Sequence, residues 1–156
     1  MRYLFIISFL FGFNVNGQSI NWISFEEAFK LQQTNPKNII VDVYTNWCGP
    51  CKLLDRNTFQ NKQVADFINK NFYAVKFNAE GNALIKFDDR EFTNPNYRPE
   101  MANRRNGNHQ LTRYLGVSAY PTVVFIDDNS DIIYKLRGYN TPVSYTHLTL
   151  PTKRLV

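Results

Sequence analysis

The chain contains two cysteines, Cys48 and Cys51, which are separated by Gly49 and Pro50. They follow residues 39–44, whose β-branched and apolar side chains predict a buried strand. Pro50 favours the first turn of a helix, because its missing N–H would have no partner there. A thiol at a helix start lies near unpaired backbone N–H groups and the positive end of the helix dipole. Both favour the nucleophilic thiolate, and a second thiol one turn later can resolve a mixed disulfide.

Two other interpretations of the cysteine pair are open. A structural zinc site needs four ligands, and His109 and His147 are the two histidines that could join the cysteines. A purely structural disulfide is the second alternative, although closing so short a loop gains little entropy. The spacing and the expected helix start favour a redox-active pair over both.

The cysteines and the strand before them resemble the active site of the thioredoxin family. Residues 47–52 read Trp-Cys-Gly-Pro-Cys-Lys, and Asp42 lies within the preceding strand. The resemblance implies that Cys48 attacks a substrate disulfide and that Cys51 resolves the mixed disulfide. It also implies that Asp42 matches the family's buried acid, which assists proton transfer at the second cysteine.

Three residues near the motif have a structural alternative beside the role that the resemblance implies. Burial would raise the pKa of Asp42 toward the range useful for a general base, whereas the alternative is a solvated acid on a one-sided strand. Trp47 matches the family's tryptophan beside the nucleophile, and it would also serve as a packing aromatic. Lys76, in a strand expected over residues 72–78, matches a family lysine near the buried acid, with a solvated lysine as the alternative.

Tyr120 and Pro121 precede an apolar run at residues 123–126, which predicts another strand. The Tyr-Pro-Thr sequence resembles the family's cis-proline loop, which lies opposite the two cysteines. The resemblance implies a cis peptide bond before Pro121 and a loop backbone that pairs with an extended substrate. Gly138 matches the glycine that ends the family's last strand. The substrate-binding residues expected from the resemblance are Trp47, Gly49, Pro50, Tyr120 and Pro121.

The order of elements predicts an α/β fold. Apolar strands alternate with helical patterns between residues 20 and 78, and Ser24 with Glu27 predicts a capped helix start. The resemblance specifies a thioredoxin-like fold, in which helices flank a mixed central sheet. This resemblance covers residues 20–80 and 109–138. Within the family, the sequence is similar to exported members such as the C-terminal domain of the bacterial membrane disulfide reductase.

Residues 81 to about 108 form an insertion before the cis-proline loop, relative to the compact family pattern. Hydrophobic residues flank Asp88 and Asp89, which predicts a small hairpin, and a polar stretch follows. A long insertion in a compact domain is often functional or mobile. It is either a partner-recognition flap near the thiols or a surface elaboration, and the second interpretation is favoured. His109, at the start of the next helix, is expected on the surface.

Residues 1–17 predict a secretory signal peptide. Arg2 precedes an apolar run at residues 3–13, and Gly17 permits cleavage before Gln18. The run is short for a membrane span, so an uncleaved anchor is the alternative, and no cysteine follows it that could carry a lipid at that point. We therefore expect export to a bacterial periplasm or a similar compartment, where disulfides persist.

Residues 18–142 have the length of one domain. The formal net charge of the whole chain is +5, with 18 basic and 13 acidic residues. Arg2, Lys153 and Arg154 lie outside the domain, which leaves 15 basic residues against 13 acidic ones, a net charge of +2. This balance gives no electrostatic case for nucleic acid, and we expect a monomer.

Residues 143–152 lack an apolar stripe at helical spacing, and Pro151 interrupts any helix in the segment 143–156. They resemble the translation of a transposon adapter used in sequencing libraries, and we interpret them as a non-native fusion scar. The last helix of the family pattern is therefore expected to be missing. The segment should be irregular and weakly packed.

The sequence predicts an exported thiol–disulfide oxidoreductase that reduces protein disulfides. We expect this enzyme to need no metal and no cofactor other than the redox-active Cys48–Cys51 pair. The reducing direction is expected because Gly49-Pro50 between the cysteines resembles the reducing members of the family. A disulfide oxidase or isomerase and a redox-inert binding module of the same fold are the alternatives. The expected partners are disulfide-bonded proteins and an upstream thiol electron donor, such as a membrane reductase. The expected catalytic residues are Cys48, Cys51, Asp42 and Lys76.

Overall fold

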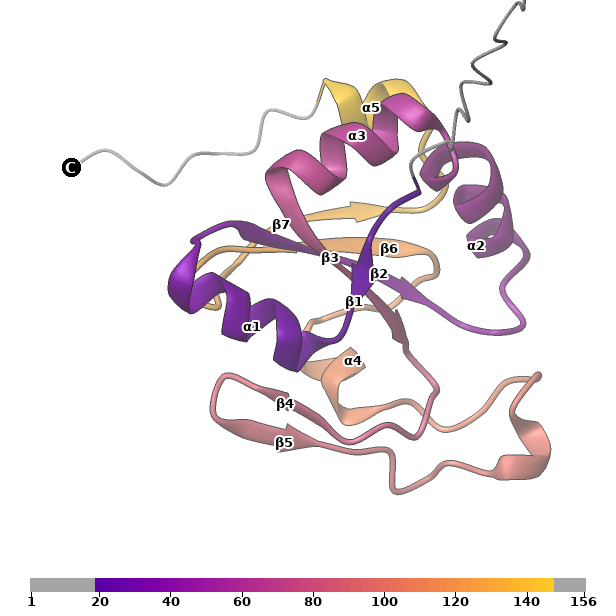
Figure 1. Ribbon diagram of the computed structural model, residues 1–156. Helices are drawn as coiled ribbons and strands as arrows, with labels where there is room; N and C mark the ends of the chain where they lie inside the picture. Colours follow the sequence, from indigo (N-terminus) through magenta and orange to yellow (C-terminus); the bar gives the residue numbers. More distant parts are fainter. Residues whose placement is uncertain (1–18, 148–156) are drawn as a thin grey trace, which may run out of the picture.

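The computed structural model describes residues 19–147, so the predicted signal peptide lies outside the described residues. A five-stranded mixed sheet, in the order β1-β3-β2-β6-β7, forms the centre of the domain (Figure 1). Strands β1, β3 and β2 are parallel, whereas β6 is antiparallel to β2 and to β7. The strands are β1 (Trp22–Ile23), β2 (Asn38–Tyr44), β3 (Phe72–Asn78), β6 (Thr122–Ile126) and β7 (Ile132–Arg137). The predicted α/β fold with a mixed central sheet is confirmed.

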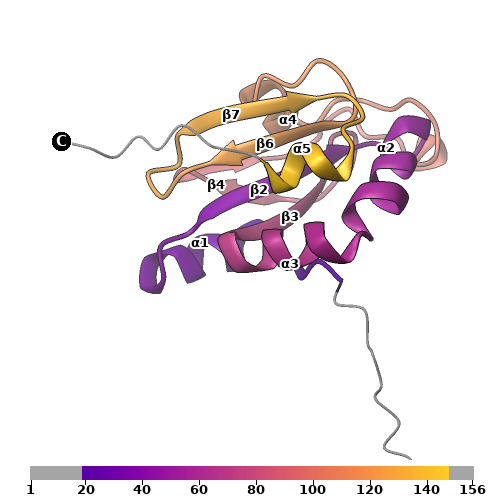
Figure 2. The same cartoon turned by 90° about the horizontal axis from the view of Figure 1, so that it is seen from above.

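Helices cover both faces of the sheet (Figures 1 and 2). One face carries α2 (Gly49–Leu54), the π-helical turn η1 (Asp55–Phe59), α3 (Lys62–Asn71) and α5 (Pro142–Thr146). The other face carries α1 (Phe25–Thr34), α4 (Gln110–Tyr114) and a hairpin of β4 (Ile85–Phe87) and β5 (Arg90–Phe92). A 3-10 turn, η2 (Pro99–Met101), lies between β5 and α4. None of these described helices is long and apolar enough to cross a membrane.

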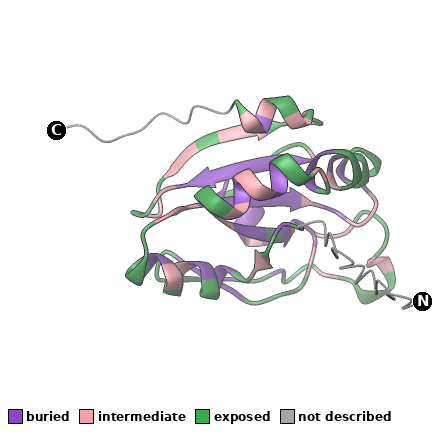
Figure 3. Ribbon diagram, turned by 45° about the horizontal axis from the view of Figure 1, so that its top comes forward, coloured by how far each residue is buried: buried purple, intermediate pink, exposed green. Residues whose placement is uncertain are grey.

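The sheet separates the core into two clusters, and its middle is coloured as buried in Figure 3. The central residues of β2 are all buried. Side chains alternate along a strand, so Ile39, Val41 and Val43 enter the cluster under α1 and the hairpin. Ile40 enters the cluster under α2 and α3. Asp42 shares the face of Ile40, which directs its carboxyl group toward α2.

The start of α1 follows the sequence prediction. Ser24 is the N-cap, and its hydroxyl accepts a hydrogen bond from the backbone N–H of Glu27 at 3.1 Å. The helix ends at Thr34, two residues before Pro36. The local signals of this segment therefore agree with its tertiary environment.

The hairpin of the insertion belongs to the core, so its interpretation as a surface elaboration is wrong. Asp88 and Asp89 both have positive φ angles, of 51° and 54°, as a two-residue hairpin turn of this twist requires. Phe87 is only 1% exposed, and its ring lies 6.1 Å from that of Phe25 and 5.1 Å from that of Phe29. The aromatic face of the hairpin thus completes the core beneath α1.

His109 is fully buried, which corrects the expectation of a surface residue. Its Nδ1 accepts a hydrogen bond from the N–H of Leu111, so the imidazole caps α4, and its Nε2 lies 2.8 Å from the carbonyl oxygen of Ala83. Burial lowers the pKa of His109, while the contact with the Ala83 carbonyl opposes that shift. The insertion creates this environment, because Ala83 belongs to it.

The last helix is present as the five-residue helix α5, so two expectations for residues 143–146 are wrong. They are neither irregular nor weakly packed, because Tyr145 is 1% exposed and its ring lies 5.6 Å from that of Phe59. Pro142 stands in the first turn of α5, where a proline is tolerated. One buried aromatic thus anchors a helix that has no long apolar stripe. Residues 148–156 lie outside the described part of the chain.

Candidate active site

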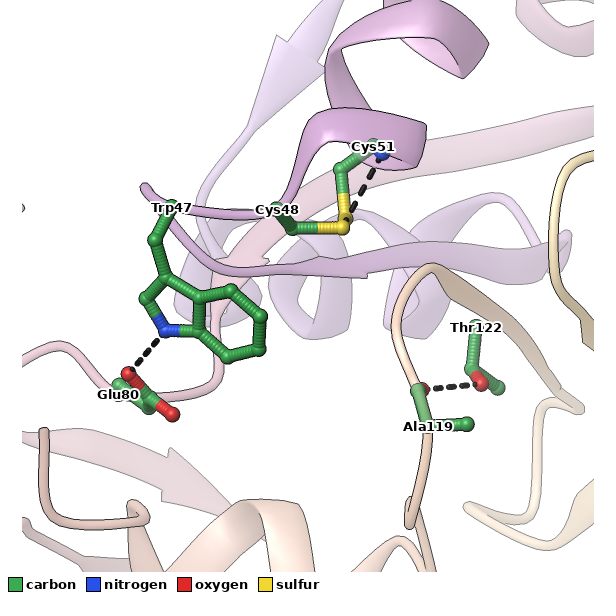
Figure 4. The surroundings of a disulfide bond; sticks show 6 residues. All are labelled: Trp47, Cys48, Cys51, Glu80, Ala119 and Thr122. Carbon is green, nitrogen blue, oxygen red and sulfur yellow. Dashed lines mark hydrogen bonds between the residues drawn. A yellow bond between two sulfur atoms is a disulfide. The ribbon is translucent and has the colours of Figure 1, made fainter. Parts of the chain in front are cut away.

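Cys48 and Cys51 are joined in a disulfide, with 5.3 Å between their Cα atoms (Figure 4). Cys48 is the N-cap of α2, and its Sγ accepts a hydrogen bond from the N–H of Cys51 at 3.1 Å. Pro50 lies in the first turn, as predicted. The two cysteines are 2% and 6% exposed. The start of α2 therefore presents both sulfurs together, beside backbone N–H groups that favour a thiolate.

A zinc site gains no support from the geometry. His109 uses both ring nitrogens in contacts with the backbone of α4 and of the insertion. Among residues 19–147, no group of three or more His, Cys, Asp or Glu side chains is arranged to hold a metal ion. The described residues thus offer the cysteines no further set of ligands.

The Tyr120–Pro121 peptide bond is cis. The hydroxyl of Thr122 donates to the carbonyl of Ala119 at 2.8 Å, a bond drawn near the disulfide in Figure 4, and the N–H of Gly138 donates to the carbonyl of Pro121 at 2.8 Å. The ring of Tyr120 lies 6.1 Å from that of Trp47, edge to face. Burial, reinforced by the charge of Glu80, raises the pKa of Tyr120 to about 12, so this hydroxyl stays protonated. The loop that was predicted as a substrate-binding element therefore adjoins the cysteine loop.

Asp42 is 3% exposed, which rules out the alternative of a solvated acid. Burial is the largest cause that raises its pKa to about 7, the positive charge of Lys76 opposes this, and the negative charge of Asp55 adds to it. Its Oδ1 has no hydrogen-bond partner among the described residues. Asp42 and Cys51 line one pocket of about 230 Å³, which is large enough for water to carry a proton between them.

Lys76 binds Asp55 and not Asp42. The two charged groups form an ion pair, and the Lys76 ammonium also lies 5.1 Å from the ring centroid of Trp22. Because Lys76 is paired and only a third exposed, it is not a freely solvated lysine either. The sequence interpretation missed Asp55, although its position four residues after Cys51 places it on the same side of the helix.

Trp47 is held from the insertion side of the site. Its Nε1 donates to the Oε2 of Glu80 at 2.7 Å, and the same oxygen accepts the backbone N–H of Asn106 at 2.8 Å. Figure 4 shows the bond between Trp47 and Glu80. Glu80 is 8% exposed. Neither Glu80 nor Asn106 was identified from the sequence, because nothing in their local patterns indicates a contact with a tryptophan more than thirty residues earlier.

The comparisons with known proteins agree with this geometry. A family model for a thioredoxin-like domain matches residues 25–149. The C-terminal domain of DsbD from Neisseria meningitidis, solved in the oxidised form, superposes with a TM-score of 0.51 at 17% identity, covering 78% of this chain and 85% of that one. A thioredoxin from Thermus thermophilus gives a TM-score of 0.57 at 17% identity, covering 81% and 82%. These two likenesses concern the fold alone.

Two further relatives are more similar in sequence. A Bacteroides thetaiotaomicron protein, described as a candidate disulphide-isomerase, is 29% identical with a TM-score of 0.56, covering 83% of this chain and 88% of that one. The thiol:disulfide interchange protein DsbD of Campylobacter jejuni is 34% identical over 59 residues, or 38% of this chain. The match spans only 10% of the length of that DsbD.

The family model covers far more than half of the sequence, and it includes the cysteine pair, the buried acid and the cis-proline loop. The chain belongs to the thioredoxin-like domain family, with the fold and the Cys-x-x-Cys pair of a thiol–disulfide oxidoreductase.

Proposed function

We propose that this protein reduces disulfides in other proteins through the Cys48–Cys51 dithiol. The observation that carries the proposal is the shared pocket, in which the buried carboxyl group of Asp42 lies beside Cys51 at the start of α2. A purely structural disulfide has no use for a buried acid without a hydrogen-bond partner, because such a group costs stability. The acid has a use if Cys51 must gain and lose a proton.

The exchange proceeds in two steps. The thiolate of Cys48 attacks one sulfur of the substrate disulfide, a mixed disulfide forms, and the first substrate thiolate leaves. Asp42 then takes the proton of Cys51, and the Cys51 thiolate attacks the Sγ of Cys48. The second substrate thiolate leaves, two electrons have passed to the substrate, and the protein holds the disulfide seen here. Asp42, with a pKa of about 7, can take up and return this proton near neutral pH.

The substrate is an extended segment of another protein. The backbone N–H and carbonyl of Tyr120 offer hydrogen-bonding groups for such a strand, and Trp47 with Gly49 and Pro50 forms the opposite contact. Pro121 fixes this loop, because its own carbonyl already accepts the N–H of Gly138. We infer export from the predicted signal peptide of residues 1–17, and the similarity to DsbD supports this inference. The reaction would then take place outside the cytoplasm. An upstream thiol donor, such as a membrane reductase, would then regenerate the dithiol.

Trapping of the mixed disulfide tests the roles of the two cysteines. Cys51→Ser should accumulate a covalent complex with a disulfide-bonded peptide, because the resolving thiol is absent, and Cys48→Ser should accumulate none. The complexes are counted by non-reducing electrophoresis and mass spectrometry. Equal trapping by both variants would contradict the assignment, and trapping by neither would favour the redox-inert binding module.

The reduction potential decides the direction of exchange. Equilibration of the wild-type protein with glutathione buffers gives this potential from the ratio of dithiol to disulfide. A value near that of reducing thioredoxins, about −270 mV, supports a reductase. A value near that of strong oxidants, about −120 mV, would show that the alternative of a disulfide oxidase is correct.

A further inference from the structure

The second half of the insertion, residues 94–108, is anchored directly to the active-site loop. We call this segment the arm. The side-chain amide of Asn46 donates to the carbonyl oxygen of Ala102 at 2.8 Å. Glu80 joins the arm to Trp47, because its Oε2 accepts both the indole N–H and the backbone N–H of Asn106. The arm is therefore joined to Asn46 directly and to Trp47 through Glu80.

The arm also reaches the opposite side of the site. The hydroxyl of Tyr120, in the cis-proline loop, lies 3.4 Å from the Oδ1 of Asn108. One segment thus adjoins both loops that we propose to hold the substrate. No separate element of the compact family pattern occupies residues 94–108, so this contact is a property of the insertion.

Buried hydrogen bonds fix the base of the arm. Asn94 is 8% exposed, and its amide donates to the carbonyl oxygens of Gly81 at 2.9 Å and Gly107 at 2.6 Å. Gly107 packs so closely that an added Cβ would lie 2.6 Å from the carbonyl oxygen of Asn96. The Oδ1 of Asn106 accepts the N–H of Arg98 across the turn. The arm is therefore a built structure with a defined position beside Trp47.

The exposed surface of the arm is positively charged. Arg98, Arg104 and Arg105 are exposed, and the ion pairs found among residues 19–147 include none of them. Glu100 is the one acidic residue within the arm, which leaves it a formal charge of +2. The guanidinium carbon of Arg105 lies 4.8 Å from the ring centroid of Trp47, so this charge stands directly over the active-site tryptophan.

We propose that the arm is a substrate-recognition surface, and that it selects protein disulfides whose flanking residues are acidic. The proposal rests on the proposed function and names its substrate class. Guanidinium groups bind carboxylates with two parallel hydrogen bonds, and a charged rim mainly accelerates encounter with the complementary partner. Acidic residues a few positions from the reacting cystine would lie against the arm while Cys48 attacks the disulfide.

The test compares two disulfide-bonded peptides that are identical except for flanking glutamates or flanking lysines. The readout is the ratio of the apparent second-order rate constants with which the reduced protein reduces the acidic and the basic peptide. The wild-type protein should favour the acidic peptide by roughly tenfold at low salt, and the ratio should shrink as salt screens the charges. Arg104→Glu with Arg105→Glu should reverse the preference.

The matched control is Lys30→Glu with Lys70→Glu, which changes the net charge equally. Both lysines are exposed and lie on α1 and α3, outside the arm. The control should keep the wild-type ratio, since only charges beside the site steer the substrate. Equal rates for both peptides with the wild type, or the same loss of preference in the control, would overturn the proposal.

Two further measurements distinguish a failure of the arm proposal from misfolding of a variant and from a failure of the proposed function. If the double glutamate variant does not fold, Arg104→Gln with Arg105→Gln removes the charges with smaller perturbation, and an unchanged ratio in that variant would also overturn the proposal. Reduction of bis(2-hydroxyethyl) disulfide, which is small and neutral, tests the dithiol alone. A wild-type protein that fails on this compound would contradict the proposed function, whereas success there with equal peptide rates contradicts only the role of the arm.

Discussion

Lys76 lies opposite Asp42 in the register of the parallel strands β3 and β2, yet its ammonium group forms an ion pair with Asp55. Asp42 is left with one carboxylate oxygen that has no hydrogen-bond partner among the described residues. Because burial outweighs the attraction of Lys76, the pKa of Asp42 rises to about 7. The ion pair thus fixes the lysine at the pocket and leaves the buried acid able to exchange a proton.

Asp42→Asn should change how stability depends on pH. A native pKa of about 7 exceeds the unfolded value of 3.8, so between these pH values only the native state holds the proton. Stability from this group is complete below about pH 4 and is lost as the pH rises through 7. The asparagine variant should match the wild type near pH 4 and exceed it at pH 8, by an amount on the order of 2–4 kcal/mol. Urea unfolding at both pH values measures this, and equal stability differences would show that Asp42 does not titrate in this range.

The same substitution should slow disulfide reduction near neutral pH. An amide cannot accept the proton of Cys51, and loss of a positioned base typically costs on the order of 100-fold or more. The measurement is the single-turnover rate of peptide disulfide reduction from pH 5 to 9. Asp128→Asn removes an exposed acid distant from the pocket and should leave this profile unchanged. An unaltered profile in Asp42→Asn would assign Asp42 a purely structural role.

Phe87→Ala should destabilise the domain by about 3–5 kcal/mol, because a fully buried aromatic leaves a cavity. The control is Leu84→Ala in the same insertion, where the side chain is 53% exposed and the cost should stay below about 0.5 kcal/mol. Thermal and urea unfolding measure both variants.

Replacing residues 82–106 by a short Gly/Ser loop should unfold the protein, because it removes the buried aromatic side chains of the hairpin. A stable, folded domain after that replacement would show that the hairpin is dispensable.

Two substitutions at Tyr145 separate its ring from its hydroxyl. The ring is buried against Phe59, so Tyr145→Ala should cost about 3–5 kcal/mol. The hydroxyl has no hydrogen-bond partner among the described residues, and burial raises the pKa of Tyr145 far above its usual value. Tyr145→Phe should therefore be neutral or stabilising by up to about 1 kcal/mol. A strongly destabilised phenylalanine variant would reveal a partner for the hydroxyl.

We propose that residues 143–156 are a fusion scar, and an independent genomic clone tests this. The clone should diverge from the present sequence at about Val143 and continue into an amphipathic helix, which would take the place of α5 against α3. That helix would bury three or four large apolar side chains at roughly 1.5–3 kcal/mol each. A clone that encodes residues 143–156 unchanged would refute the scar.

Local signals in the sequence predicted much of the scaffold. The capped start of α1, the strand that carries Asp42 and the two-residue turn at Asp88-Asp89 all follow from patterns within a few residues. The resemblance of residues 47–52 to a known motif supplied the cysteine pair. Such features are predictable because their physical causes, namely capping, side-chain alternation and turn conformation, act between neighbours in the chain.

The tertiary structure decided which distant groups meet. Only the packed fold shows that Lys76 pairs with Asp55, that His109 is buried beneath the insertion, and that Glu80 joins Trp47 to the arm. Each of these contacts depends on how the sheet, α2 and the insertion are placed in space, and the sequence carries no local signal for that placement. Burial and charge then act together at the site, so the pKa of Asp42 follows from the fold and not from the residue's type.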